Sequence, residues 1–164
     1  MLRRSNRLIS EFLERRSLLA SITWDGGGDG TSWSSANNWS TNSIPTSNDD
    51  VTINAGPALV NVNADAVAKS IQCSAPLSLS ASLSVTNGAT YHALFTWTQG
   101  ALIGSHTFSA ASDATFSGPG IKRMDDVVIN QGELTYTGTN LQFSSATLTN
   151  SGFIYANNSG SFTS

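Results

Sequence analysis

The fold is decided by stretches such as residues 134–158, which read "LTYTGTNLQFSSATLTNSGFIYANN". Apolar and polar residues alternate there in short runs that Gly, Asn and Ser interrupt. Alternation with a period of two gives a β-strand one buried face and one solvated face. Eleven runs of this kind lie between residues 51 and 157, and they leave no room for a helix. They span residues 51–54, 59–63, 70–74, 77–85, 94–98, 106–110, 114–118, 127–130, 133–137, 141–149 and 153–157. The body of the chain is therefore predicted to be all-β.

The runs also repeat one another. "FTWTQGAL" (95–102) parallels "LTYTGTNL" (134–141), and "TFSAASDATFSG" (107–118) parallels "QFSSATLTNSG" (142–152). Repeats of about 20 to 40 residues are typical of stacked coils, because each coil adds one unit and its turns tolerate insertions. A Greek-key sandwich has no reason to repeat itself. We therefore expect a β-solenoid, and at about 20–25 residues per rung residues 51–164 supply about five rungs.

The aligned repeats bring aromatic residues to matching positions. Trp97 aligns with Tyr136, and Phe108 aligns with Phe143. Aromatic side chains that recur at one repeat position are expected to stack from rung to rung, inside the coil or along one of its faces.

Composition supports a polar β-structure with little charge. Charged residues make up 12% of the chain, against about 25% in an ordinary soluble domain. The chain contains 26 Ser, 17 Thr and 14 Asn, which compete with helical backbone hydrogen bonds. Residues 21–164 hold three basic and nine acidic residues, so no basic patch is available to bind nucleic acid or an anionic membrane. No apolar run approaches the ~20 residues of a membrane-spanning helix.

Residues 22–50 are rich in Trp and Gly and carry no basic residue. The first rung of a solenoid exposes its core and unpaired strand edges, so it needs a cap. We interpret Trp24, Trp33 and Trp39 as the apolar part of that cap. Two alternatives remain open: the same rings could form an exposed sugar-stacking platform, or Asp25 and Asp29 of "DGGGDG" could bind a cation. The absence of a bidentate Glu at the end of this loop favours solvated carboxylates, so no metal or other cofactor is predicted.

Residues 1–21 form a separate, basic segment with five Arg. Its end, "LERRSLLAS", resembles the Leu-Glu-Pro-Arg-x-Leu-Leu motif near the N-terminus of many large extracellular bacterial proteins. The matching residues are Leu13, Glu14, Arg16, Leu18 and Leu19, and Arg15 stands where that motif has proline. The resemblance implies a processed export segment. The alternative is a helical or disordered tail with no addressing role.

The body of the chain, about residues 51–164, resembles the Ser/Thr/Asn-rich right-handed parallel β-helices of bacterial surface and secreted proteins. Residues 24–53 resemble the module that often precedes such helices, with Trp, then Asn-Trp, then proline, then acidic residues before the first strand. The resemblance implies the right-handed coil and a secreted or cell-surface location.

Residues with catalytic chemistry are few. The acidic candidates of the strand region are Asp65, Asp113, Asp125, Asp126 and Glu133, and the basic candidates are Lys69, Lys122 and Arg123. We expect the acidic residues to lie in turns without recurring at one repeat position, and "IKRMDD" (121–126) to be a solvated turn between rungs. His92 and His106 are expected at the surface, and the lone Cys73 in the core.

The expected function is therefore that of a structural or adhesin-like β-helix, or an N-terminal fragment of one, without catalysis. A carbohydrate-binding module with exposed Trp and a remnant of a polysaccharide-degrading β-helix are the alternatives. Residues 147–164 still match the repeats and contain no cap-like segment. The expected partners are a surface polysaccharide and a second copy, which would associate through the open C-terminal rung.

Overall fold

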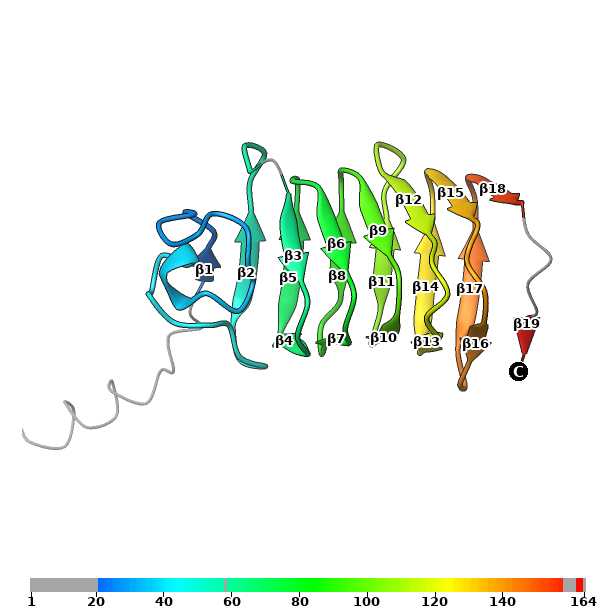
Figure 1. Cartoon of the computed structure of the whole chain (residues 1–164), viewed down its shortest axis with the longest axis horizontal. Coiled ribbons are helices and arrows are strands. Elements are labelled where there is room, and N and C mark those ends of the chain that lie inside the picture. The colour runs from blue at the N-terminus through cyan, green and yellow to red at the C-terminus, as the bar shows by residue number, and fades with distance from the viewer. Residues whose placement is uncertain (1–20, 58, 158–161, 164) are drawn as a thin grey trace, which may run out of the picture.

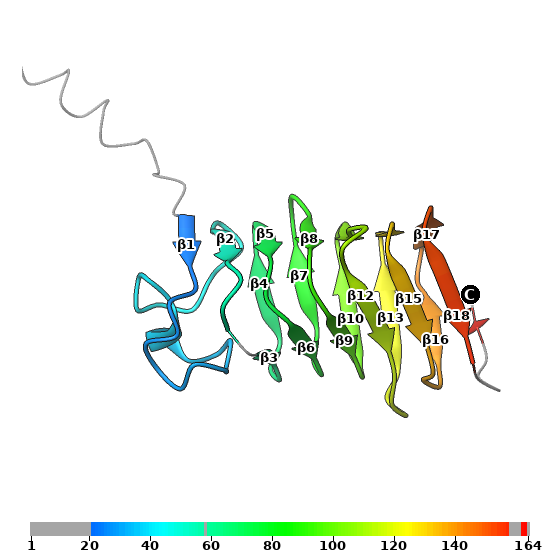
Figure 2. The same cartoon turned by 90° about the horizontal axis from the view of Figure 1, so that it is seen from above.

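The computed structural model describes residues 21–57, 59–157 and 162–163 of the chain. These residues form a parallel β-solenoid of about five turns, with a cap at its N-terminal end (Figure 1). Each turn of the coil contains three short strands, which belong to three different parallel sheets (Figure 2). The all-β prediction and the solenoid prediction are both confirmed. The one helix among the described residues is a short 3-10 turn, η1 (Ala36–Asn38), and no described helix is long and apolar enough to span a membrane.

The three sheets are called A, C and D. Sheet A contains β1 (Ser21–Thr23), β2 (Asp50–Ile53), β5 (Ser70–Cys73), β8 (Ala89–Tyr91), β11 (His106–Phe108), β14 (Val127–Asn130) and β17 (Thr147–Asn150). Sheet C contains β3 (Val60–Val62), β6 (Leu77–Leu79), β9 (Phe95–Trp97), β12 (Asp113–Phe116), β15 (Glu133–Tyr136) and β18 (Phe153–Ala156). Sheet D contains β4 (Ala66–Ala68), β7 (Leu83–Val85), β10 (Gly100–Ile103), β13 (Lys122–Asp125), β16 (Leu141–Phe143) and β19 (Phe162–Thr163).

The core lies inside the coil and is built from columns of residues in register. One column of sheet A contains Val51, Ile71, Ala89, His106 and Val128, all buried. The alternating strand pattern sends every second side chain inward, and parallel register stacks equivalent side chains about 4.8 Å apart from strand to strand. Successive members of this column are 17 to 22 residues apart in sequence. The turns are thus slightly shorter than the predicted 20 to 25 residues.

An aromatic column runs through the middle of sheet C. Trp97 pairs in register with Phe116, and Phe116 pairs with Tyr136. The rings of Trp97 and Phe116 meet edge to face, with 5.0 Å between their centroids. The sequence alignment of Trp97 with Tyr136 therefore matches the structure, with one further turn between the two residues.

The alignment of Phe108 with Phe143 is wrong. Phe108 lies in sheet A, where its register partners are Tyr91 and Asn130, whereas Phe143 lies in sheet D beside Met124. A pattern with a period of two looks the same for all three strands of a turn, so an alignment can slip by one strand without changing its apolar matches.

Two asparagines continue a sheet A column beyond Phe108. The side-chain amide of the buried Asn130 donates to Oδ1 of Asn150 at 2.7 Å, and also to the carbonyl oxygens of Gly132 and Phe153. Asn150 donates in the same way to Gly152, two residues further on. This repeated hydrogen bond holds the bend after β14 and the bend after β17 in the same shape.

The sequence did not predict the corners of the coil. The runs at 77–85 and 141–149 each divide into two strands, and β1, β4, β8, β10, β13 and β19 fall outside the predicted runs. Gly100 begins β10 and Gly104 follows it, each with φ of +92°, and a Cβ on either would lie about 2 Å from a backbone oxygen of the preceding turn. These close approaches set the corners, and they depend on the neighbouring turn.

The segment 121–126, predicted to be a solvated turn, mostly forms a strand. Lys122–Asp125 is β13, which pairs with β10 and β16 inside sheet D. The sequence of this segment does not alternate between apolar and polar residues, because Lys122 faces inward at a position where an apolar residue was expected. The strand was therefore not recognised.

Candidate functional site

The Trp-rich cap packs onto the first turn. Strand β1 pairs with β2, and the segment around Ser32 bridges to Asn61 of β3, so the cap covers edges of sheets A and C. Trp24, Trp33 and Trp39 are all buried, and the Trp39 ring meets the other two edge to face at centroid distances of 4.9 and 4.8 Å. Stacking on a sugar requires an exposed ring face. These tryptophans therefore do not form the exposed platform that a Trp-based sugar site requires.

Asn38 organises the glycine-rich loop of the cap. Its Oδ1 accepts hydrogen bonds from the backbone N–H groups of Gly28 and Gly30, and its Nδ2 donates to Asp29 and to the Ser32 carbonyl. Gly28 lies so close that a Cβ there would be 2.9 Å from the Asn38 Oδ1. One buried side-chain amide thus supplies hydrogen-bond partners for backbone groups that have none from regular secondary structure.

The two aspartates of this loop bind the loop itself. Asp29 accepts hydrogen bonds from the backbone of Thr31 and Ser32 and from Asn38. Hydrogen bonds from the Ser32 side chain and backbone, followed by that from Asn38, hold the pKa of the Asp29 carboxyl well below its usual range. Asp25 accepts a hydrogen bond from the Gly27 N–H. No group of three or more His, Cys, Asp or Glu side chains that could hold a metal ion occurs among the described residues.

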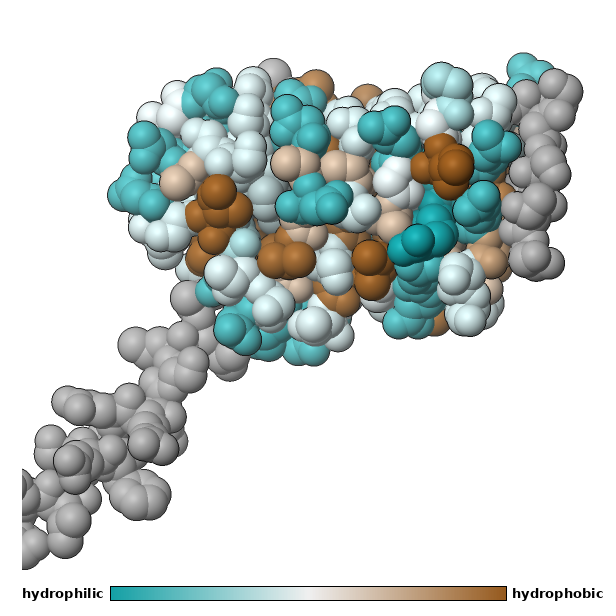
Figure 3. All heavy atoms as spheres, turned by 60° about the horizontal axis from the view of Figure 1, so that its bottom comes forward, coloured by the Kyte–Doolittle hydropathy of each residue, from teal (hydrophilic) through white to brown (hydrophobic). Residues whose placement is uncertain are grey.

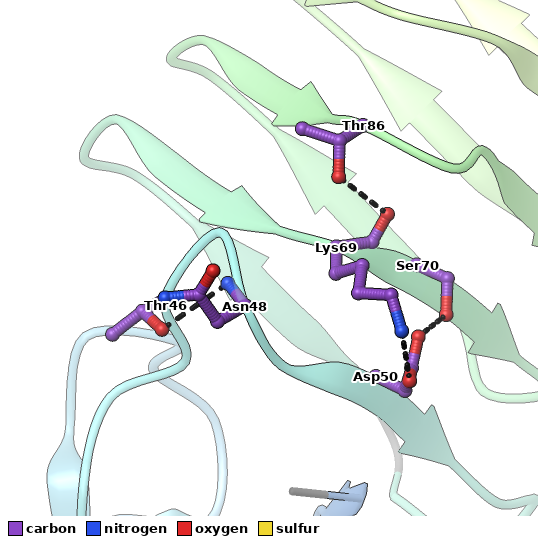
Figure 4. Close-up of polar contacts among 6 residues, drawn as sticks. All are labelled: Thr46, Asn48, Asp50, Lys69, Ser70 and Thr86. Atoms are coloured by element: carbon purple, nitrogen blue, oxygen red, sulfur yellow. Dashed lines mark hydrogen bonds and ion pairs between the residues drawn. The ribbon is translucent and has the colours of Figure 1, made fainter. Parts of the chain in front are cut away.

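Lys69, a candidate cation for lyase chemistry, joins the first two turns of the coil. Its Nζ lies 2.7 Å from Oδ2 of Asp50, whose other oxygen accepts a hydrogen bond from Ser70 (Figure 4). The hydrogen bond from Lys69, followed by that from Ser70, lowers the pKa of Asp50. The carbonyl oxygen of Lys69 accepts from the hydroxyl of Thr86 in the next turn. The positive charge of Lys69 is therefore already paired with the Asp50 carboxylate of sheet A.

Lys122 is turned into the coil. It is fully buried, and its Nζ donates to the carbonyl oxygens of Gly118 and Gly120 at 3.1 and 2.9 Å. A third carbonyl, that of Thr139, lies at 3.5 Å. Burial lowers the pKa of the Lys122 ammonium. Lys122 thus links two neighbouring corners of the coil through hydrogen bonds, and its amine is not accessible to solvent.

Arg123 points outward from the same strand. Its guanidinium makes a bidentate contact with Asp125, with Nε 2.9 Å and a terminal nitrogen 2.8 Å from Oδ2. Beside it lies a shallow pocket of about 320 Å³, lined by Ser82, Gly100, Ala101, Ile121, Arg123 and Gln142. Figure 3 shows the face that holds these strands of sheet D, where hydrophobic and hydrophilic side chains alternate. The small residues Gly100 and Ala101 make the hollow, since they fill less of the wall than their neighbours.

A larger hollow, of about 430 Å³, lies where the cap meets the loop after β2. It is lined by Trp24, Asp25, Gly26, Gly30, Asn54, Ala55, Gly56 and Pro57. Trp24 contributes little exposed surface to it.

A polar group is buried where the sequence predicted a surface histidine. His106 is fully buried, and Tyr91 lies 3.0 Å from its Nδ1. The carbonyl oxygen of Ile103 lies 3.2 Å from Nε2, so Nε2 donates there and Nδ1 accepts from the Tyr91 hydroxyl. Burial lowers the pKa of His106 to about 4. The prediction that His106 lies at the surface is wrong, because its polar neighbours in sequence face outward while its own position faces inward. His92 is exposed, as predicted.

Cys73 is buried in the core, as predicted, beside Tyr91 in the same column. Its Sγ donates weakly to the Ala75 carbonyl, and burial raises the pKa of the thiol to about 11. Burial also raises the pKa of Tyr91. A thiol that stays protonated is a poor nucleophile, so Cys73 is a packing residue.

The acidic candidates divide between turns and strands. Asp65 and Asp126 lie in turns, as predicted. Asp113 and Glu133 begin neighbouring strands and are register partners, so the prediction that acidic residues do not recur at one repeat position is wrong for this pair. Both side chains are exposed. A glycosidase needs one carboxyl kept protonated by an apolar surround, and an exposed pair lacks that surround.

Neither a family model, nor a curated protein, nor a solved structure matches this chain, so its own fold and surface are the basis for a functional proposal.

Proposed function

We propose that this chain is a secreted or cell-surface β-solenoid with a structural and adhesive role and no catalytic activity. The observation that carries this proposal is that each of the three basic side chains of residues 21–164 already has partners within the protein. Lys69 and Arg123 are paired with carboxylates, and Lys122 is buried among carbonyl oxygens. A polysaccharide lyase needs a free basic group as base or to neutralise a uronate. His106 and Cys73, which could also act in catalysis, are buried.

The adhesive contact that we propose is the pocket beside Arg123. An arginine paired with a carboxylate retains N–H groups that can donate to sugar hydroxyls, and the Gln142 amide both donates and accepts. Ile121, 54% exposed, offers an apolar edge next to them. Because the Arg123–Asp125 pair is electrically neutral, a neutral surface polysaccharide fits this pocket better than an acidic one.

Retention of the full chain on a panel of immobilised neutral and acidic polysaccharides tests this function. We expect retention on a neutral polysaccharide, weaker retention for Gln142→Ala and for Arg123→Ala, and no release of soluble sugar. Gln131→Ala, which truncates an exposed glutamine in the bend after β14, is the matched control and should bind normally. Release of soluble fragments from any polysaccharide would contradict the non-catalytic role, and equal binding by all variants would exclude this pocket.

Export is the part of the proposal that rests on the "LERRSLLAS" motif, most of which lies outside the described residues. Ser21 is the first residue of β1 and pairs with Asp50. Processing close after Ser21 would remove this first residue of β1 and leave the cap from Ile22 onward, together with the coil. N-terminal sequencing of protein from the extracellular fraction is the measurement, and recovery of chains that still begin at Met1 would contradict it.

A further inference from the structure

The outer face of sheet C carries a regular array of uncharged polar side chains. Six tripeptides, one per strand, build it: NVN (61–63), SLS (78–80), TWT (96–98), TFS (115–117), TYT (135–137) and YAN (155–157). Register pairing aligns the first residues in one column. Ladder hydrogen bonds such as Thr98 N–H to Leu79 O and Thr137 N–H to Phe116 O carry the alignment on to the third residues.

Buried side chains of the core fix the position of the array. The middle residue of each tripeptide points inward, and in the first five turns it is buried. Three of these residues are Trp97, Phe116 and Tyr136, which form the aromatic column of the core. The outward side chains therefore repeat about every 4.8 Å across the strands and about every 6.6 Å along them. Threonine is β-branched and has few χ1 rotamers, so its hydroxyl and methyl groups keep defined directions.

The hydroxyls of this array are available to an outside partner. Thr96, Thr115 and Thr135, in the centre of the face, make no side-chain hydrogen bond within the described residues, whereas the Thr98 hydroxyl donates to Leu79 O at 3.3 Å. The charged residues in the described strands of sheet C are Asp113 and Glu133, which stand one column outside the array. Sheet A resembles sheet C in this respect, with Asp50 at the start of β2, whereas sheet D carries Arg123 and Asp125 on its outer face in the middle of the sheet.

We propose that the outer face of sheet C binds the surface of an ice crystal. The array repeats in two directions, at about 4.8 Å and about 6.6 Å, and the surface of an ice crystal also presents water oxygens that repeat in two directions. Each Thr hydroxyl can take the place of a lattice water, because it both donates and accepts hydrogen bonds. The neighbouring methyl group keeps disordered water out of the space between the protein and the ice.

Two other features of the face favour ice over other flat ligands. Charged groups hold strongly oriented hydration water that does not fit an ice lattice, and the two columns contain none. A crystalline polysaccharide would be recognised by outward aromatic rings, and Tyr155 at one end is the single aromatic residue of the two columns. This surface is separate from the sugar pocket on sheet D, so either proposal can fail without the other.

Ice growth in the presence of the full chain tests the proposal. The readouts are the shape of single crystals, the gap between melting and freezing points, and the inhibition of recrystallisation. Thr115→Lys places a charge in the middle of the face and should reduce the gap severalfold. Thr107→Lys is the control, because Thr107 has the matching outward position in the middle of β11 on sheet A, and it should leave the gap unchanged.

Thermal unfolding and circular dichroism establish that each variant is folded, and Thr96→Lys replaces Thr115→Lys if the latter does not fold. Reduced activity in the sheet C variant alone supports the proposal. Unshaped crystals with the unaltered chain, or equal loss in both variants, would overturn it. Binding to crystalline cellulose without any effect on ice would also overturn it, in favour of a polysaccharide ligand.

Discussion

Asn38 supports the cap through four hydrogen bonds from one buried side chain. The cap contains little regular structure, so its backbone N–H groups depend on side-chain acceptors. A buried donor that loses its acceptor costs about 1–3 kcal/mol. The adjacent Trp39 ring packs against both other tryptophans, which joins the Asn38 network to the apolar part of the cap.

We expect Asn38→Ala to destabilise the protein by about 2 kcal/mol or more, because two glycine N–H groups lose their acceptor. Urea unfolding followed by tryptophan fluorescence is the measurement, since the three cap tryptophans report directly on this region. Asn37→Ala is the matched control, because Asn37 is exposed. Equal unfolding midpoints for the two variants would show that the Asn38 network does not support the cap.

His106 gives the core a dependence on pH. The folded protein binds a proton at this residue with a pKa of about 4, whereas an unfolded histidine titrates near 6.5. The stabilising contribution of the neutral ring is therefore fully present above pH 6.5. It is lost progressively as the pH falls towards 4, by about 1.4 kcal/mol per pH unit at most.

We expect the free energy of unfolding, measured in urea, to fall between pH 7 and pH 5, and the fall to be smaller in His106→Phe. Phenylalanine retains a ring but carries no titratable group, so the slope with pH is the informative quantity, whatever the absolute stability. His92→Phe should retain the slope of the unaltered protein, because His106 is still present. An unchanged slope in His106→Phe would show that another group titrates.

At the scale of the elements, the strands are held by columns that cross the turns. Phe116 shows this best, because it lies between Trp97 and Tyr136 in register and also approaches Phe108 of sheet A, with 5.8 Å between ring centroids. A strand of three or four residues has little stability of its own. Its position is fixed by the strand before it, the strand after it and the side chains inside the coil.

We expect Phe116→Ala to cost about 3–5 kcal/mol, as for other large cavities in cores, and Phe116→Leu to cost clearly less. Phe153→Ala removes the same ring from an exposed position, 68% accessible, and should change stability by no more than about 0.5 kcal/mol. Urea unfolding of the three variants compares them. A small effect of Phe116→Ala would mean that the column does not stabilise the coil.

The sequence predicted the strands of sheets A and C better than those of sheet D. Runs such as 94–98 and 133–137 alternate cleanly, and they contain β9 and β15. Sheet D contains short strands next to corners, and its β13 places Lys122 inside. An inward lysine is accommodated because three carbonyl oxygens of two different corners surround its ammonium. A local pattern does not contain that information.

At the scale of the whole molecule, the two ends of the coil differ. The cap covers the first turn, whereas in the described residues no strand follows β17 and β18 in their sheets. Ile154 stands in the inward column of Leu134, yet it is 40% exposed where Leu134 is 2% exposed. Core side chains and strand edges are thus accessible at one end, which favours edge-to-edge association.

We propose that a second copy of the chain associates with the exposed edges of β17 and β18. Size-exclusion chromatography with light scattering at increasing concentration is the measurement, and Ile154→Lys should shift the chain towards the monomer. Ile121→Lys, on the side wall of the coil, is the matched control and should not. A monomer that stays unchanged at high concentration would contradict this expectation.

The sequence predicted the β-solenoid, and it predicted a Trp-rich cap with a sugar-stacking platform left open as an alternative. Alternation and repetition are local properties, so they can be recognised without the tertiary structure. The sequence did not show which strands share a sheet, that Lys122 and His106 are buried, or that Asp113 and Glu133 are neighbours. These depend on the register between turns 17 to 22 residues apart. Strand faces look alike in the sequence, and only hydrogen bonding between successive turns distinguishes them.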